Sequence, residues 1–572
     1  MKLFPKKSKH LDISFAALLL LLSISAVAAP TVEQGVLQSA NAVFNSPELM
    51  SHYLAGEIAA HDGDLDTAFE HYMQIMIPAN DVSIARRATH IGLHLKSKAV
   101  AQAAQLWTQL APDDIEAWKA LLVLLVNAAD RDGAVEAIDA LMDVAETQQS
   151  DGFIQVAAVV AESGNKELGL ELVKNLAERH ERDPKAHYAL AIAYFAQKDQ
   201  QAAEASLRAA LSLKKDDPKI WVLLARILDV SKRTDESEKL LHLAVEQLPD
   251  NDLLRLSYAE HLVIHEKYEQ AYKEFQLLHK ALPENDEITR ALGSLAIELH
   301  YWSDAREIWS EMMAGHGGKD RALYFLGQVE EGSGDAEKAH AYYAKVGGAL
   351  RSDAKIRSAQ LLAKQGDLPK ALKMIATTRL SNMEDAVRLY LVESDLLSDA
   401  NRGMQAMGLL DKALAEHPQQ ADLLYARGML GDEMGSVEIL ERDMRAIIET
   451  DPENAQALNA LGYTLTAYDD RLQEARELIN KAYALMPESA AILDSMGWVE
   501  FRLGNLDEAE KYLRMAAEID QDSEIMAHLG EVLWLKGARE EADQIWRDAL
   551  HLEPESKHLL ETMKRLQQQD EQ

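Results

Sequence analysis

The chain of 572 residues contains no cysteine. This absence excludes disulfide bonds, zinc sites with thiolate ligands, a thiol nucleophile and a lipid-modified N-terminal cysteine. Basic residues are also scarce, because 59 Lys and Arg stand against 94 Asp and Glu and leave a net charge of −35. Such an excess repels phosphate groups, and no stripe of Lys and Arg compensates for it. The composition therefore argues against nucleic-acid binding and against docking on anionic lipid.

Long apolar runs are absent from the chain except near its N-terminus. Four lysines between residues 2 and 9 precede the apolar run 13–27, which leads into Ala26-Val27-Ala28. This order is typical of a secretory signal peptide with an A-x-A cleavage site, so we predict a signal peptide over residues 1–28. The alternative is an uncleaved anchor, for which the run is short relative to a bilayer. Export of a chain without cysteine or a eukaryotic sorting tail favours a periplasmic location in a bacterial cell envelope.

A period of 34 residues runs through the middle of the chain. Small residues recur at this spacing, and each is followed after 12 residues by a second small residue and after 16 by a bulky apolar one. The first positions are Ala191, Ala225, Ala259, Gly293 and Gly327, and the last are Leu207, Leu241, Phe275, Trp309 and Tyr343. Two antiparallel helices need this pattern to approach closely and interlock. The pattern resembles the tetratricopeptide repeat.

The repeat predicts an all-α fold, a right-handed α-solenoid of about fifteen helical hairpins. Gly334, Gly504 and Gly537 each fall seven residues after the small first-helix residue, where we expect a left-handed residue between the two helices. Prolines fall at unit edges, so we expect none inside a helix. The predicted parts are a signal peptide (1–28), an N-terminal helical segment (29–49), degenerate repeats (50–182), a regular array (183–351), further degenerate repeats (352–417), a C-terminal array (418–555) and a capping helix with a tail (556–572).

Motifs that carry chemistry are few. No H-E-x-x-H, G-x-S-x-G or G-x-x-x-x-G-K-[ST] occurs, so we expect no enzyme, no catalytic residue and no cofactor. The pairs His90/His94 and His261/His265 have metal-like spacing on one helical face. Two imidazoles alone do not make a zinc site, because a third ligand must come from elsewhere. We therefore expect no bound metal, and the alternative of a metal-dependent hydrolase rests on these pairs alone.

The first helices of successive repeats line the concave wall of such a solenoid, where side chains are free to bind another protein. The phase of Gly462, Gly497 and Gly530 predicts eight residues on this wall: Asn459, Tyr463, Asp494, Trp498, Phe501, Arg502, Glu531 and Trp534. Trp, Tyr and Arg are the residue types that dominate binding hot spots. The alternative places Trp498 and Trp534 in the core between helices. The acidic wall favours a basic or apolar partner surface.

The C-terminal part of the chain carries a narrower resemblance. Residues 457–465, 491–505 and 524–537 look like the tail of exported proteobacterial tetratricopeptide proteins. Among these are adaptor lipoproteins that bind a periplasmic carboxyl-terminal processing protease and bring it peptidoglycan hydrolases for degradation. The resemblance implies a non-enzymatic periplasmic adaptor with these two kinds of protein partner. Those adaptors are anchored through a lipidated cysteine, which this chain lacks, so membrane association stays open. The alternative is a scaffold for outer-membrane or polysaccharide-export assembly.

Overall fold

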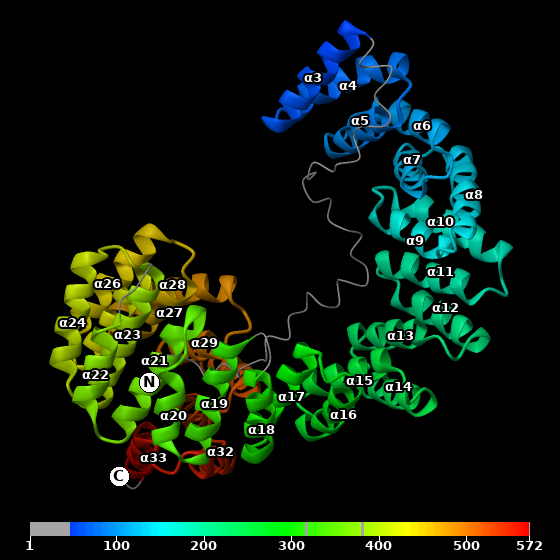
Figure 1. Cartoon of the computed structure of the whole chain (residues 1–572). Helices are drawn as coiled ribbons and strands as arrows, with labels where there is room; N and C mark the ends of the chain where they lie inside the picture. The colour runs from blue at the N-terminus through cyan, green and yellow to red at the C-terminus, as the bar shows by residue number, and fades with distance from the viewer. Residues whose placement is uncertain (1–45, 315–317, 379–382, 571–572) are drawn as a thin grey trace. The chain divides into compact units, whose positions relative to one another are not determined.

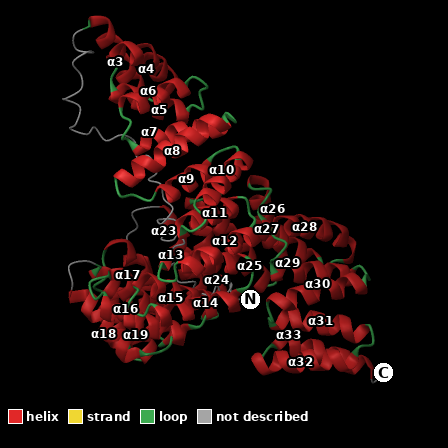
Figure 2. Ribbon diagram, turned by 90° about the vertical axis from the view of Figure 1, so that its right-hand side faces the viewer, coloured by secondary structure: helices red, strands yellow, loops and turns green. Residues whose placement is uncertain are grey.

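The computed structural model describes residues 46–314, 318–378 and 383–570. Over these ranges the chain forms thirty-one α-helices and two short 3-10 helices, and no strand (Figure 2). The predicted all-α fold is therefore confirmed. The predicted signal peptide and residues 29–45 of the predicted N-terminal segment lie outside the described ranges. No helix in the described part of the chain is long and apolar enough to cross a membrane.

The helices form two compact units, divided between Ile308 and Trp309 (Figure 1). The helices of the unit that precedes this point are α3 (Pro47–His61), α4 (Leu65–Ala79), α5 (Val82–His94), α6 (Val100–Leu110), α7 (Ile115–Asn127), α8 (Arg131–Thr147), α9 (Gly152–Glu162), α10 (Lys166–Arg179), α11 (Pro184–Ala196), α12 (Gln200–Leu213), α13 (Pro218–Val230), α14 (Thr234–Gln247), α15 (Asp252–Ile264), α16 (Tyr268–Ala281) and α17 (Asp286–Glu298). The division falls inside α18 (Trp302–Ala314).

The helices of the unit that follows are α19 (Lys319–Ser333), α20 (Ala336–Tyr343), α21 (Arg351–Lys364), α22 (Leu368–Ala376), α23 (Met383–Asp399), α24 (Gly403–Glu416), α25 (Ala421–Glu433), α26 (Val437–Thr450), α27 (Ala455–Leu465), α28 (Leu472–Leu485), α29 (Ala490–Arg502), α30 (Leu506–Ile519), α31 (Ser523–Leu535), α32 (Arg539–Leu552) and α33 (Lys557–Asp570). The 3-10 helices are η1 (Gly348–Leu350) and η2 (Asp469–Arg471). In chain order the described α-helices make fifteen consecutive pairs and the single helix α33, which agrees with the predicted number of hairpins.

Each repeat is set by local signals that the sequence displays. Asp183 and Asp217 cap α11 and α13, where each carboxylate accepts a hydrogen bond from a first-turn amide and a proline occupies the first turn. Gly334, Gly504 and Gly537 have φ values of 89°, 84° and 87°, so the predicted left-handed turn residue is confirmed. Four non-glycine residues take the same turn position at steps of 34 residues, namely Lys198, Lys232, Glu266 and His300.

One expectation about proline was wrong. Pro78 lies inside α4, one residue before the helix ends at Ala79. The position is tolerated because Pro78 lies in the last turn with one helical residue after it, and Asn80 ends the helix in the left-handed conformation with φ 50°.

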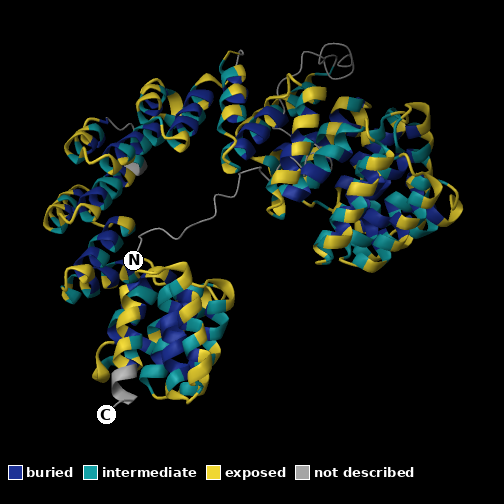
Figure 3. Ribbon diagram, turned by 90° about the horizontal axis from the view of Figure 1, so that it is seen from below, coloured by how far each residue is buried: buried dark blue, intermediate teal, exposed yellow. Residues whose placement is uncertain are grey.

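The small and bulky positions of the repeat meet as predicted. A Cβ atom added to Gly530 would lie 2.0 Å from Nε1 of Trp546, sixteen residues later, and one added to Gly327 would lie 2.4 Å from the ring of Tyr343. Trp546 and Tyr343 are almost fully buried. The bulky side chain of the second helix therefore occupies the space that the missing side chain of the first helix leaves. Buried residues follow the faces where helices meet, and exposed residues cover the outer faces (Figure 3).

Candidate protein-binding wall

The eight predicted wall residues lie on three helices of the C-terminal repeats. Asn459 and Tyr463 belong to α27, the four residues from Asp494 to Arg502 belong to α29, and Glu531 and Trp534 belong to α31. Each of these helices is the first of its pair, and α27 contacts α29, α29 contacts α31 and α31 contacts α33. Figure 2 shows this part of the chain from α26 to α33. The first helices therefore adjoin one another, as the predicted wall requires.

A buried ion pair lies at the centre of the wall. Nδ1 of His528, on α31, lies 2.9 Å from Oδ1 and 3.1 Å from Oδ2 of Asp494, on α29. The His528 side chain is 1% exposed and that of Asp494 8%. Burial opposes protonation of the His528 ring, but the neighbouring Asp494 carboxylate outweighs it and raises the pKa of His528 above its ordinary value. The carboxylate therefore favours the protonated imidazole, and the contact joins two successive repeats.

An aromatic side chain covers this ion pair. Trp498 is half-buried and stacks on His528, with ring centroids 4.0 Å apart and ring planes 21° apart. Phe501 lies beside it at 4.9 Å, and the ring of His558 on α33 meets His528 edge-on at 5.4 Å. The stacking holds the Trp498 ring in a defined orientation while part of it stays accessible to solvent.

Two further polar contacts link the same helices. The Tyr463 hydroxyl on α27 donates a hydrogen bond to Glu524 on α31 at 2.8 Å. This bond joins two first helices that are not consecutive, because α29 is the first helix between them. Burial, and then the charge of Glu524, raises the pKa of Tyr463 well above its ordinary value, so the hydroxyl keeps its proton. Glu531 is buried and pairs with Arg565 on α33 at 2.5 Å. The wall carboxylates of Asp494, Glu524 and Glu531 are therefore all paired within the chain.

The remaining predicted residues lie apart from this cluster. Arg502 donates to the carbonyl of Thr466 and pairs with Asp469 at 2.8 Å. Trp534 packs against Trp546 on α32, with ring centroids 5.5 Å apart, and the guanidinium of Arg539 lies over it. Trp534 thus belongs to the interface within its own hairpin. Oδ1 of Asn459 is buried, and no hydrogen-bond partner for it occurs among the described residues.

Sequence reasoning missed four residues of the cluster: Glu524, His528, His558 and Arg565. A signal for two of them existed, because His528 follows Asp494 and Arg565 follows Glu531 by 34 residues, which is the repeat period. We call the residues Tyr463, Asp494, Trp498, Glu524, His528, Glu531, His558 and Arg565 the C-terminal wall cluster. Its polar groups are largely satisfied internally, which leaves Trp498 as its main apolar contact point.

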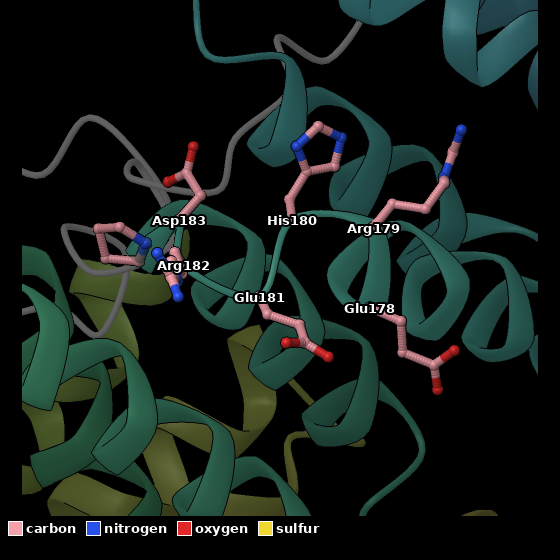
Figure 4. A pocket seen from close by; sticks show the side chains of 7 residues that line it. Glu178, Arg179, His180, Glu181, Arg182 and Asp183 are labelled. Carbon is pink, nitrogen blue, oxygen red and sulfur yellow. The ribbon is translucent and has the colours of Figure 1, made fainter.

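A hollow around the turn between α10 and α11 offers no comparable site. Residues 178–184 line it, and their labelled side chains fan out in different directions (Figure 4). Arg179 pairs with Asp139, the ring of His180 meets Phe153 edge-on, and Asp183 caps α11. These side chains therefore serve local structure and do not converge on a ligand.

Profiles described as tetratricopeptide repeat match residues 160–218, 195–260 and 467–529. A TPR repeat-containing protein of Pseudomonas aeruginosa is 40% identical over 213 residues, which are 37% of this chain and 36% of that protein. Bacteriophage adsorption protein A of Escherichia coli is 26% identical over 98 residues, 17% of this chain and 10% of that protein. The chain thus spans little more than a third of the first relative and a tenth of the second.

Solved tetratricopeptide structures also align with the chain. A thermophilic TPR protein of Thermus thermophilus covers 32% of this chain with 97% of its own, at 22% identity and a TM-score of 0.29. A tetratricopeptide repeat protein of Parabacteroides merdae covers 44% with 100% of its own, at 16% identity and a TM-score of 0.35. The helix pairs, their interlocking residues and the matching profiles lead to one conclusion: the chain contains tetratricopeptide repeats, which form an α-solenoid suited to binding other proteins.

Proposed function

We propose that this chain is an exported, non-enzymatic scaffold that captures another protein on its C-terminal wall. The observation that carries the proposal is Trp498, which is half-buried and held by its stacking on His528. Binding hot spots favour large aromatic side chains that lose little conformational freedom when a partner arrives. A tryptophan already fixed on a buried ring meets both conditions.

The paired carboxylates also bear on the kind of partner. Asp494 and Glu531 are each buried with a cationic partner from a neighbouring helix, so their charges are already compensated. A basic partner would gain little binding energy from these two carboxylates. Of the basic and apolar partner surfaces that the sequence suggested, the wall therefore favours the apolar one, including aromatic segments.

The same cluster argues against catalysis at this place. Asp494 and His528 supply two members of an Asp-His-Ser arrangement, in which the second imidazole nitrogen must meet a nucleophile. Nε2 of His528 is buried, and no hydrogen-bond partner for it occurs among the described residues. No hydroxyl meets that nitrogen among the described residues, which supports a structural role for the pair in the proposed scaffold.

Within this class of function, we propose a periplasmic adaptor between a carboxyl-terminal processing protease and peptidoglycan hydrolases. Two sequence features support this narrower proposal: the order of charged, apolar and small residues over 1–28, and the resemblance of residues 457–537 to exported adaptors. Such an adaptor would act by raising the local concentration of substrate near the protease, without doing chemistry itself.

Affinity capture tests the proposal. The full chain, with a C-terminal tag, is recovered from the cell envelope of its own organism, and stoichiometric partners are identified by mass spectrometry. Recovery of a processing protease together with a peptidoglycan hydrolase is the expected result. Recovery of outer-membrane or polysaccharide-export components in their place would overturn the adaptor proposal but keep the scaffold. Recovery of no stoichiometric protein would count against both.

A further inference from the structure

Three side chains with metal-binding chemistry meet in the N-terminal unit, far from the wall cluster in sequence. Asp229 lies in the last turn of α13, His261 lies in the last turn of α15, and His265 follows α15 directly. The two helices are first helices of adjacent repeats and contact each other (Figure 1). One ligand atom from each residue lies within 4.8 Å of the other two. Stacking of the repeats thus supplies the third ligand that the His261/His265 pair lacks in the sequence.

Within the described part of the chain, two atoms of these three side chains are buried without a hydrogen-bond partner. His261 is 4% exposed, and its Nδ1 lies 3.2 Å from Oδ2 of Asp229. The other ring nitrogen, Nε2, and the other carboxylate oxygen, Oδ1, are both buried and unpaired. Only five such side-chain atoms occur among the described residues, so two of the five belong to this one place. Leaving such atoms unpaired is costly, which points to a ligand that would bind them.

The ring of His265 completes the arrangement from the solvent side. Its centroid lies 4.5 Å from that of His261, and the residue is half-buried. The trio is therefore a partly open site, with a buried base formed by Asp229 and His261. A bound ion would keep one coordination position for water or for a side chain of another protein.

We propose that Asp229, His261 and His265 bind one divalent transition-metal ion. Two imidazole nitrogens and one carboxylate oxygen form a donor set suited to Zn²⁺ and similar ions of borderline softness. Ca²⁺ and Mg²⁺ prefer oxygen ligands throughout, so the two imidazoles disfavour them. The proposal goes beyond the protein-binding function and stands independently of it, because it concerns other repeats and a different class of ligand.

The second histidine pair provides a control within the same chain. His90 and His94 share the four-residue spacing on α5, but they do not form part of any such trio among the described residues. His90 instead meets the ring of Trp107 edge-on at 5.3 Å, and its burial lowers its pKa. If the four-residue spacing were enough for metal binding, both histidine pairs would bind metal with the same affinity.

Equilibrium dialysis tests the site. The full chain is prepared without a polyhistidine tag, stripped with chelator and dialysed against micromolar Zn²⁺ in millimolar Mg²⁺, which occupies non-specific carboxylates of this acidic chain. We expect one zinc ion per chain, and a loss of affinity of about 10-fold or more in Asp229→Asn and in His265→Ala. His94→Ala should bind zinc with the same affinity and stoichiometry as the unchanged chain.

The substituted positions are partly exposed, and circular dichroism checks that both variants fold. Co²⁺ gives a second measurement, because its visible spectrum reports nitrogen and oxygen ligands in a low-symmetry site, and this signal should vanish in His265→Ala. Absence of stoichiometric zinc in the unchanged chain would overturn the proposal. Equal affinity in the unchanged chain, Asp229→Asn and His265→Ala would do so as well.

Discussion

His528 and Asp494, which are 34 residues apart in the chain, form a buried ion pair with 2.9 Å between Nδ1 and Oδ1. The pair joins α31 to α29, and Trp498 closes over it by stacking on the imidazole. The wall of the C-terminal repeats is thus held by a charged contact between neighbouring repeats as well as by the apolar interlocking within each hairpin. The pair links the stability of this unit to pH.

Asp494→Asn should destabilise the C-terminal repeats more at about pH 6 than at alkaline pH above the folded-state pKa of His528. Because the folded-state pKa of His528 is raised, the pair contributes its full stability below the ordinary pKa of histidine and loses it as pH rises through the folded value. Breaking a buried pair costs about 3 kcal/mol while both groups are charged. Chemical unfolding at the two pH values measures the difference.

The matched control is Asp469→Asn, which removes the partner of Arg502. The Asp469 side chain is 91% exposed, so the loss should be small at both pH values. An Asp494→Asn effect at about pH 6 that is no larger than the Asp469→Asn effect would contradict a charged His528.

Trp498→Ala should weaken capture of the partner by at least about 2 kcal/mol, roughly 30-fold in affinity, if this ring is the hot spot of the wall. Helical content should stay unchanged, because the ring is only half-buried. The control is Trp118→Ala on α7, which removes another half-buried tryptophan in the other unit. Binding assays with the captured partner measure both variants. A collapse of stability in Trp498→Ala, or equal loss of binding in both, would count against the hot spot.

Gly530→Ala should destabilise the chain by about 1–3 kcal/mol. The added methyl group would overlap the indole of Trp546, which is buried and has no room to retreat. Gly408→Ala is the matched control, because no described atom beyond the neighbouring backbone of α24 lies within 4 Å of the added atom on this exposed face. That change should stabilise the helix by about 0.5–1 kcal/mol. Thermal melts of the two variants should therefore shift in opposite directions.

Lys198→Gly should stabilise the chain by about 0.5–1 kcal/mol. Lys198 is exposed and holds φ at 62°, a conformation that costs an L-residue about 1 kcal/mol and glycine almost nothing. Gly334→Ala makes the reverse change at the equivalent turn and should destabilise the chain by a similar amount. If both substitutions shift the melting temperature in the same direction, turn strain is not the cause.

Asp395→Asn should stabilise the chain above about pH 6. Burial first, and then the charges of Asp399 and Glu433, raise the pKa of Asp395 to about 6. Ionisation is thus unfavourable in the folded state, and stability falls as pH rises from the ordinary value of 3.8 to about 6. The neutral amide removes this penalty, a gain of about 1–2 kcal/mol once partial solvent screening is allowed for.

Unfolding at about pH 7.5 and at about pH 4 measures this gain, which should shrink at the lower pH. Asp411→Asn is the control, because that carboxylate pairs with Arg427 at 2.8 Å and its loss brings no gain. A loss of stability in Asp395→Asn at the higher pH would show that the carboxylate is favourably paired there.

The sequence by itself determined the repeating unit of this protein. A helical hairpin has three local requirements. It needs glycine or alanine where its two helices approach closely, a left-handed turn residue seven positions later and a bulky residue sixteen positions later. Their spacing therefore predicts the fold, as Gly327 with Tyr343 and the turn at Gly334 show. The close approach tolerates only small side chains, so it leaves a readable residue type. The left-handed turn favours glycine but is also taken by other residues, such as Lys198, so it is readable only in some repeats.

Only the tertiary structure decided which polar side chains meet between repeats. His528 pairs with Asp494, and Asp229 joins His261 and His265, because stacking places residues about one period apart on adjoining helices. The period alone does not select these contacts, since each first helix presents several residues to its neighbour and rotation of the helix decides which of them face it. Trp498 follows Gly497 by one residue and Trp534 follows Gly530 by four, so the two tryptophans hold different positions of the repeat. Only the structure shows that the first stacks on His528 and that the second packs within its own hairpin.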